Sequence, residues 1–174
     1  MPPYRRTAQQ RTSDLAASKS FEAEVKGYLG EHVVDRTEAN DALDFWVPGL
    51  FVEVKEKRQP LTTRWTDLAP WIPERDLFIL DELSVRRACN HWPEAYFLIR
   101  DAVCNRLFVG SVVDLVSIDR VRVNRVGKGK WLIDLKHLDQ IEELGHLVSW
   151  IRSDLTEMRW KRSECLTRLP VPQV

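Results

Sequence analysis

One stretch, from Ala42 to Lys57, constrains the fold more than any other part of the chain. Its sequence, ALDFWVPGLFVEVKEK, predicts two short strands joined at Pro48-Gly49. Alternation predicts an apolar face shared by the two strands, made of Leu43, Phe45, Val47, Leu50, Val52 and Val54. The opposite face then carries two acids and a lysine, which are Asp44, Glu53 and Lys55.

The simplest register makes this charged face a candidate cation site. If Pro48-Gly49 is a two-residue turn, Val47 pairs with Leu50 and Asp44 lies directly opposite Glu53. Like charges at such a cross-strand position are destabilising, so a bound cation explains them better than solvent does. An ordinary amphipathic hairpin also shows Asp, Glu and Lys to water, and a one-residue slip would turn the acids to opposite faces.

The chemistry of a hard divalent cation suits this arrangement. Mg²⁺ prefers oxygen ligands and often uses one or two carboxylates together with water. A lysine on the same face as Glu53, two residues along the strand, can position a water or stabilise charge on a phosphate. We therefore expect Asp44 and Glu53 to bind Mg²⁺, or Mn²⁺ in its place, with Lys55 assisting.

A helix is predicted before the hairpin, from Ser13 to Leu29, with Phe21 and Val25 on its apolar stripe. Gly30 is the expected stop. Glu22 adjoins the stripe and either points toward the hairpin or stays in solvent. Glu24 on the same helix is the other candidate for a supporting carboxylate.

This combination resembles the PD-(D/E)XK nuclease superfamily. The resemblance rests on Asp44, on Glu53-Val54-Lys55 and on the helix that contains Phe21-Glu22, although Leu43 stands where the proline of the motif would be. It implies metal binding by Asp44, Glu53 and the Val54 carbonyl, activation of water by Lys55, and a supporting role for Glu22. It also implies an α-β-β-β-α-β core and the hydrolysis of DNA.

We expect an α/β, restriction-endonuclease-like core in which helices flank a mixed central sheet. Beyond the hairpin, the sequence predicts an ordered loop over 60–73, a helix from Glu74 to about His91, and strands over Ala95–Ile99, Arg106–Val116 and Trp131–Leu135. A long C-terminal helix follows, because apolar residues recur every three or four positions from Leu138 to Met158. Residues 13–160 are expected to form one domain, between a basic flexible tail over 1–12 and a disordered tail over 161–174.

Basic side chains are the candidate contacts to DNA. The segment from Arg120 to Lys130 contains no acid, which suits phosphate binding and equally suits a solvated hairpin. The expected DNA-binding residues are Arg58, Arg64, Arg120, Arg122, Arg125, Lys128 and Lys130. In the loop, Trp65 and Trp71 either face the substrate or pack the loop onto the core, and packing is favoured.

Composition adds few constraints. The formal net charge is +0, so binding to nucleic acid must come from local patches. No apolar run is long enough to span a membrane and no signal-peptide core is present, which predicts a cytoplasmic protein. The expected function is a metal-dependent endonuclease acting on DNA, with a homodimer as a further expectation. The alternative is a non-catalytic DNA-binding or complex-assembly module, and the third reading is a structural protein with a solvated hairpin.

Overall fold

The computed structural model describes residues 7–31, 33–37, 43–47, 49–125 and 128–167, without the side chains of 11, 14, 125 and 158–167. Within these ranges, six strands form a mixed sheet in the order β1-β2-β3-β5-β6-β9. Its strands are β1 (Val34–Asp35), β2 (Phe45–Val47), β3 (Leu50–Lys57), β5 (Ala95–Asp101), β6 (Arg106–Ser111) and β9 (Asp139–Ile141). β3 and β5 run parallel, and the other neighbours are antiparallel.

A second sheet of described strands has the order β4-β8-β7 and is antiparallel throughout. It consists of β4 (Leu77–Asp81), β7 (Arg120–Arg125) and β8 (Lys128–Asp134). The helices are α1 (Ala8–Leu29), α2 (Thr63–Thr66), α3 (Glu82–Cys89), α4 (Val112–Ser117) and α5 (His146–Thr167), with a short 3-10 turn at Leu135–His137. None of the helices is long and apolar enough to cross a membrane, as far as the chain is described.

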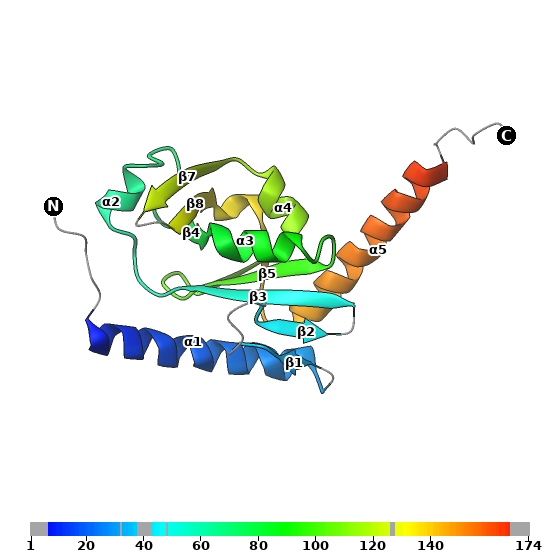
Figure 1. Cartoon of the computed structure of the whole chain (residues 1–174), viewed down its shortest axis with the longest axis horizontal. Coiled ribbons are helices and arrows are strands. Elements are labelled where there is room, and N and C mark those ends of the chain that lie inside the picture. The colour runs from blue at the N-terminus through cyan, green and yellow to red at the C-terminus, as the bar shows by residue number, and fades with distance from the viewer. Residues whose placement is uncertain (1–6, 32, 38–42, 48, 126–127, 168–174) are drawn as a thin grey trace.

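The larger sheet is buried on both faces. Phe21 and Val25 of α1, with Leu147 and Ile151 of α5, pack against one face together with Val52, Val54, Tyr96 and Leu98. Phe97 and Ile99 point to the other face, into a cluster shared with the second sheet, α3 and α4. Figure 1 shows these layers, with α1 on one side of β3 and β5 and with α3 and the second sheet on the other. The expected mixed sheet flanked by helices, with a C-terminal helix, is confirmed.

Several local predictions are confirmed. The first helix ends at Gly30, whose φ of 90° suits a residue without a side chain. It begins at Ala8, earlier than expected, where a Thr7–Gln10 capping box satisfies its first amides. The predicted strand Ala95–Ile99 is β5, and its burial on both faces explains its uninterrupted apolar sequence.

The helix predicted from Glu74 to about His91 is wrong in its first half. Leu77–Asp81 is strand β4, and α3 begins only at Glu82. The run LFIL is buried from two sides, since Leu77 packs outside the second sheet while Phe78 and Leu80 pack between the sheets. An apolar run of this length does not distinguish a buried strand from a helix by periodicity alone.

Two later boundaries also differ from the prediction. The strand predicted from Arg106 to Val116 ends at Ser111, because Ser111 and Asp114 form a capping box that begins α4. The C-terminal helix begins at His146 instead of near Leu138, after the 3-10 turn and β9. Leu138, Ile141 and Leu144 are nevertheless buried, so the apolar pattern there reflects burial of a strand and the segments beside it.

A buried ionic network closes the turn between β5 and β6. Asp101 is fully buried, and its Oδ2 accepts a hydrogen bond of 2.8 Å from Arg106 Nη2. Its Oδ1 accepts hydrogen bonds from the backbone N–H groups of Val103 and Cys104. Arg106 also donates to Asp76 Oδ1 at 2.9 Å, which links this turn to the entry of β4.

We predict that Asp101→Ala lowers the free energy of unfolding by about 3 kcal/mol, because it removes one of the two carboxylates that pair with the partly buried Arg106 and leaves two turn amides without their acceptor. Urea denaturation measures this value. Asp119→Ala, at an exposed position between α4 and β7, is the matched control and should change it by less than about 0.5 kcal/mol. Equal effects of the two substitutions would contradict the prediction.

Candidate functional site

The β2–β3 hairpin has the register that brings its two acids together. Val47 pairs with Leu50, Trp46 with Phe51 and Phe45 with Val52, so the next step along the strands places Asp44 opposite Glu53. Gly49 in the turn has a φ of 88°, while residue 48 lies outside the described residues. The predicted register is confirmed.

The predicted apolar face of the hairpin is confirmed at Phe45, Leu50, Val52 and Val54 and is wrong at Leu43. Phe45, Leu50, Val52 and Val54 belong to the cluster beneath α1 and α5. Leu43 instead packs in the cluster between the two sheets. The chain bends at Asp44, so the strict alternation of a strand does not extend back to Leu43.

A backbone hydrogen bond fixes the Asp44 carboxylate. Its Oδ2 accepts a hydrogen bond of 2.7 Å from the N–H group of Val54, which lies on β3, the opposite strand of the hairpin. Asp44 is half-buried and Glu53 is buried, with 5% of its surface exposed. The two acids are therefore held by the fold in a setting with little water.

Lys55 lies beside this pair. Its Nζ forms an ion pair with Glu53 Oε1 and donates to the carbonyl oxygen of Val54 at 3.2 Å. Three of the residues named by the sequence, Asp44, Glu53 and Lys55, therefore meet on one face of the hairpin. The Val54 backbone joins them through both its N–H and its carbonyl group.

The electrostatics of the site are those of an undercompensated acid pair. Burial and the nearby charge of Glu53 raise the pKa of Asp44 to about 6, against the opposing effects of Lys55 and the Val54 N–H group. Burial alone would lower the pKa of Lys55, but the charges of Glu53 and Asp44 raise it overall. Lys55 therefore stays protonated, and one positive charge faces two carboxylates.

Glu22 lies on α1, and its contact with this site stays a prediction. It follows Phe21 on α1, which covers the face of the sheet opposite to Glu53, although its charge adds to the rise in the pKa of Asp44. Across the described part of the chain, no group of three or more His, Cys, Asp or Glu residues could hold a metal ion. Glu24 pairs instead with Arg100 at 3.1 Å.

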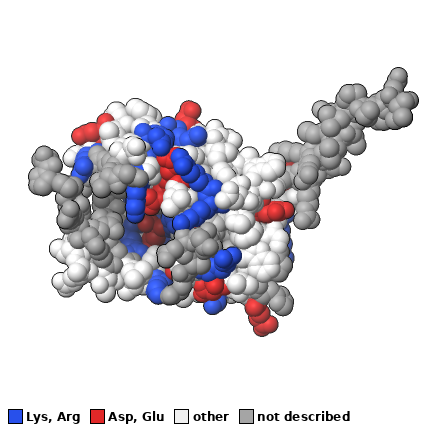
Figure 2. All heavy atoms as spheres, viewed as in Figure 1, with Lys and Arg blue, Asp and Glu red and all other residues white. Residues whose placement is uncertain are grey.

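The predicted basic residues are placed in two different ways. Several have local partners: Arg58 pairs with Glu56, Arg122 with Glu82 at 2.8 Å, Lys130 with Asp81, and Arg120 lies 4.1 Å over the ring of Trp131. Arg64 and Lys128 are exposed, and the side chain of Arg125 lies outside the described residues. In Figure 2, basic and acidic side chains gather together in a hollow between the part that carries β7 and the part that carries α1.

The loop that carries Arg64 is tied at its base. The buried Lys57 Nζ donates to the carbonyl oxygen of Glu74 at 2.7 Å, and Glu74 Oε1 accepts from the Leu61 N–H group at 2.7 Å. Trp65 packs in this loop against the outer side of the second sheet, as favoured from the sequence. Trp71 is 69% exposed, so packing does not account for it.

Sequence reasoning overlooked two features beside the acids. Trp46 and Phe51 form the register pair two residues along the strands from Asp44 and Glu53, and by alternation they lie on the same face of the hairpin as these acids. The alternation that selected Asp44 would have found Trp46, two residues further along. Asp81 and Glu82, which neutralise Lys130 and Arg122, were hidden by the incorrect helix prediction.

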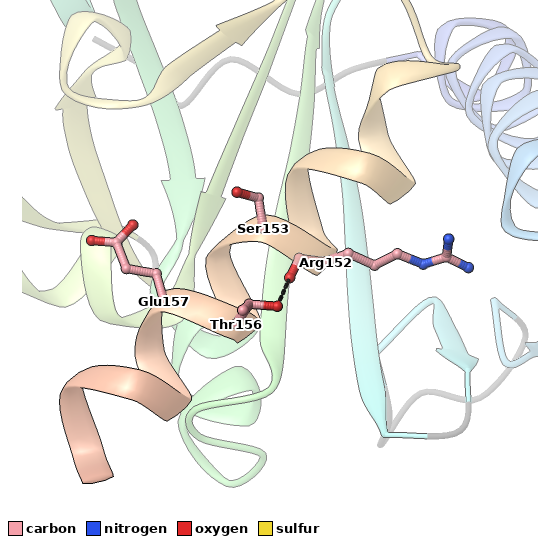
Figure 3. Close-up of a pocket in the computed structure, with 4 residues that line it drawn as sticks. All are labelled: Arg152, Ser153, Thr156 and Glu157. Atoms are coloured by element: carbon pink, nitrogen blue, oxygen red, sulfur yellow. Dashed lines mark hydrogen bonds between the residues drawn. The ribbon is translucent and has the colours of Figure 1, made fainter. Parts of the chain in front are cut away.

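A hollow of about 580 Å³ lies elsewhere, along α5. Figure 3 shows its lining residues on that one helix, with Arg152 and Glu157 pointing to opposite sides. The Thr156 hydroxyl donates to the carbonyl oxygen of Arg152 at 2.8 Å, within the helix. This hollow includes none of the site residues predicted from the sequence.

No family model matches the chain, and no curated protein matches it. Among solved structures, the chain is similar to a nuclease from a fusselovirus, with a TM-score of 0.49 and 11% sequence identity. The match covers 88% of this chain and 99% of that chain. A likeness this distant transfers no residue role from one protein to the other.

The raised pKa of Asp44 predicts a specific dependence of stability on pH. The Asp44 carboxyl binds its proton more tightly in the folded state than in the unfolded state, so protonation of Asp44 stabilises the fold. This contribution to the free energy of unfolding is complete below about pH 4 and is lost as the pH rises through about 6. Asp44→Asn keeps an acceptor for the Val54 N–H group and removes the charge. At pH 7.5, without divalent cations, it should raise the free energy of unfolding by about 2 kcal/mol.

Urea denaturation at pH 4.5 and pH 7.5 checks this expectation. The gain should shrink at the lower pH, where Asp44 is mostly protonated. Asp119→Asn, at an exposed position, controls for the general effect of removing one acid. A gain of the same size at both pH values would contradict the assignment to Asp44.

Proposed function

We propose that this protein is a metal-dependent nuclease that hydrolyses DNA phosphodiester bonds, with the Asp44–Glu53–Lys55 face as its active site. One observation carries the proposal. The Val54 N–H group holds Asp44 opposite Glu53, at a position where like charges weaken the hairpin, with a lysine at the same place. Keeping two acids together lowers the stability of the fold, as expected of a functional site.

The donor set fits a hard divalent cation. The Val54 N–H group binds Asp44 Oδ2 and so fixes the orientation of the carboxylate, whose other oxygen, Oδ1, is the proposed ligand. Glu53, opposite Asp44, supplies a second carboxylate. Carboxylate and carbonyl oxygens are the ligands preferred by Mg²⁺ and Mn²⁺. Asp44, Glu53 and the Val54 carbonyl would hold the ion, which when bound polarises a phosphoryl oxygen and acidifies water.

The chain's own residues have separable roles in this proposal. Lys55, kept protonated by the two acids, offers its ammonium group to the phosphate or to the attacking water. Asp44 must be deprotonated to bind a cation. Glu22 adds negative charge that acts on Asp44, which favours a cation there.

DNA is the proposed partner. Arg64 and Lys128 are exposed and can contact the phosphate backbone directly. Arg58, Arg122 and Lys130 would exchange an acidic partner for a phosphate, which costs part of the affinity gained. Arg120 and Arg125 are the first and last residues of β7, the strand that also carries Arg122. A homodimer that cuts both strands is part of the proposal, although Leu147 and Ile151 of α5 pack within the chain itself.

A second candidate is a non-catalytic DNA-binding or complex-assembly module on the same fold. The observation in its favour is the position of Lys55, whose ammonium group engages both Glu53 and the Val54 carbonyl, two of the proposed metal ligands. If this ion pair is permanent, it replaces the cation and no turnover follows. DNA binding without cleavage across a panel of divalent metals would support this candidate.

Cleavage assays test the nuclease proposal. With Mg²⁺ or Mn²⁺, we expect the protein to cut single-stranded, duplex or branched DNA, and Asp44→Asn and Lys55→Ala each to lower the rate by about 100-fold or more. Asp119→Asn and Lys26→Ala, on other surfaces, are the matched controls and should leave the rate unchanged. Activity that survives in both site variants would disprove the assignment.

Metal binding is predicted to be visible without any substrate. Mg²⁺ or Mn²⁺ should raise the Tm of the wild-type protein at pH 7.5, because binding to the folded state alone stabilises it and relieves the repulsion at Asp44. The Asp44→Asn variant should show little of this rise. Differential scanning calorimetry with and without the metal measures both, and equal shifts in the two proteins would place the ion elsewhere.

A further inference from the structure

A second hollow lies next to the acid pair. It has a volume of about 300 Å³ and is lined by Val34, Arg36, Trp46 and Phe51, from three neighbouring elements at one edge of the larger sheet. Neither the sequence motif nor the proposed catalytic roles account for these side chains. Their chemistry, two aromatic rings and a guanidinium group, differs from that of the surrounding core.

The strand registers place this hollow on the same face as the catalytic candidates. Val34 pairs with Trp46 and Trp46 pairs with Phe51 across the three strands. The Arg36 N–H group donates to the Asp44 carbonyl oxygen at 2.8 Å, so Arg36 lies across from Asp44. The opposite face is taken by α1, where Asp35 pairs with Lys26.

The distance between the two sites suits an extended nucleotide. Trp46 and Phe51 lie two residues along their strands from Asp44 and Glu53, which corresponds to about 7 Å. This is roughly twice the 3.4 Å rise between stacked nucleotides in one strand of a duplex. A phosphate at Asp44 and a base at Trp46 therefore match a strand that is stretched and unstacked.

The aromatic side chains are arranged to receive a flat ligand. His91 stacks on Phe51 with ring centroids 3.7 Å apart and an interplanar angle of 23°, which fixes the orientation of the Phe51 ring. Trp46 is half-buried, so its ring is held by the sheet and still reaches the hollow. The exposed Arg36 supplies a positive charge at the rim. Proteins bind single strands with this combination of aromatic ring and guanidinium group.

We propose that the hollow is a stacking subsite for one unpaired nucleobase, adjacent to the phosphate that the acid pair acts on. Trp46 stacks on the base, and Arg36 contacts the phosphate that flanks it. The substrate class is accordingly single-stranded DNA, or the unpaired end or branch of a duplex, because a paired base is not available for stacking. This inference rests on the proposed nuclease function and narrows its substrate.

Binding measurements test the subsite independently of cleavage. The full-length protein is titrated, in the presence of EDTA, against three fluorescently labelled probes: a short oligothymidylate, a sugar–phosphate oligomer of the same length without bases, and a blunt duplex. Wild-type protein should bind the oligothymidylate more tightly than the oligomer without bases. Trp46→Ala should raise the Kd for the oligothymidylate by about 5- to 150-fold and leave the Kd for the other two probes unchanged.

Three variants sharpen the result. Trp46→Phe keeps a ring and should retain most of the affinity, whereas Trp46→Leu keeps bulk without a ring and should behave like Trp46→Ala. If Trp46→Ala fails to fold by circular dichroism, Trp46→Leu replaces it. Trp71→Ala removes an exposed tryptophan on the loop before β4, and a loss of affinity there instead of at Trp46 would overturn the subsite.

The outcomes separate this inference from the nuclease proposal. Cleavage that needs Asp44, combined with binding that ignores Trp46 or ignores the bases, would refute the subsite and leave the nuclease standing. Binding that depends on Trp46 in a protein that cuts no substrate would refute the nuclease and leave the subsite standing. Preference for oligothymidylate over blunt duplex in both binding and cleavage supports both.

Discussion

The parallel pairing of β3 with β5 organises the rest of the molecule. It runs from Phe51 and Ala95 to Lys57 and Asp101, and it keeps β3 in the interior of the larger sheet. With helices against one face, the alternation of β3 sends Val52 and Val54 into that core and sends Glu53 and Lys55 to the other face. Charges on a central strand are costly to bury, so their presence requires compensation, and for Glu53 it comes from Lys55 on the same strand.

That compensation is incomplete in a way that suggests function. Lys55 neutralises Glu53, but within the described part of the chain Asp44 accepts a hydrogen bond from one backbone N–H group alone, and its pKa rises to about 6. By contrast, Asp101 at the end of β5 is fully buried and has both a guanidinium group and two amides. One fold thus contains a fully buried acid whose charge is balanced and that holds a turn, and a half-buried acid whose pKa is raised beside Glu53. This difference supports the proposal that a cation binds at Asp44 and Glu53.

The sequence predicted the hairpin well because its information is local. The pair Val47–Leu50 and the position of Asp44 opposite Glu53 follow from turn length and strand alternation. The sequence of Leu77–Asp81 predicted helix because its strand structure depends on antiparallel pairing with β8, about fifty residues later in the chain. The pairing of Arg122 with Glu82 depends on the same contact and was hidden for the same reason. Predictions from the sequence failed where the second sheet, assembled from distant segments, decides the environment.

The tie between Lys57 and Glu74 has an evolutionary consequence. Because the two ends of the segment between them are joined at the sheet, the chain from 58 to 73 can change in length or composition without altering the strand that carries Glu53 and Lys55. Strand β3 and the loop that carries Arg64 can then evolve separately. If the proposed function holds, such a division lets the same acid pair serve substrates of different geometry after exchange of a single surface segment.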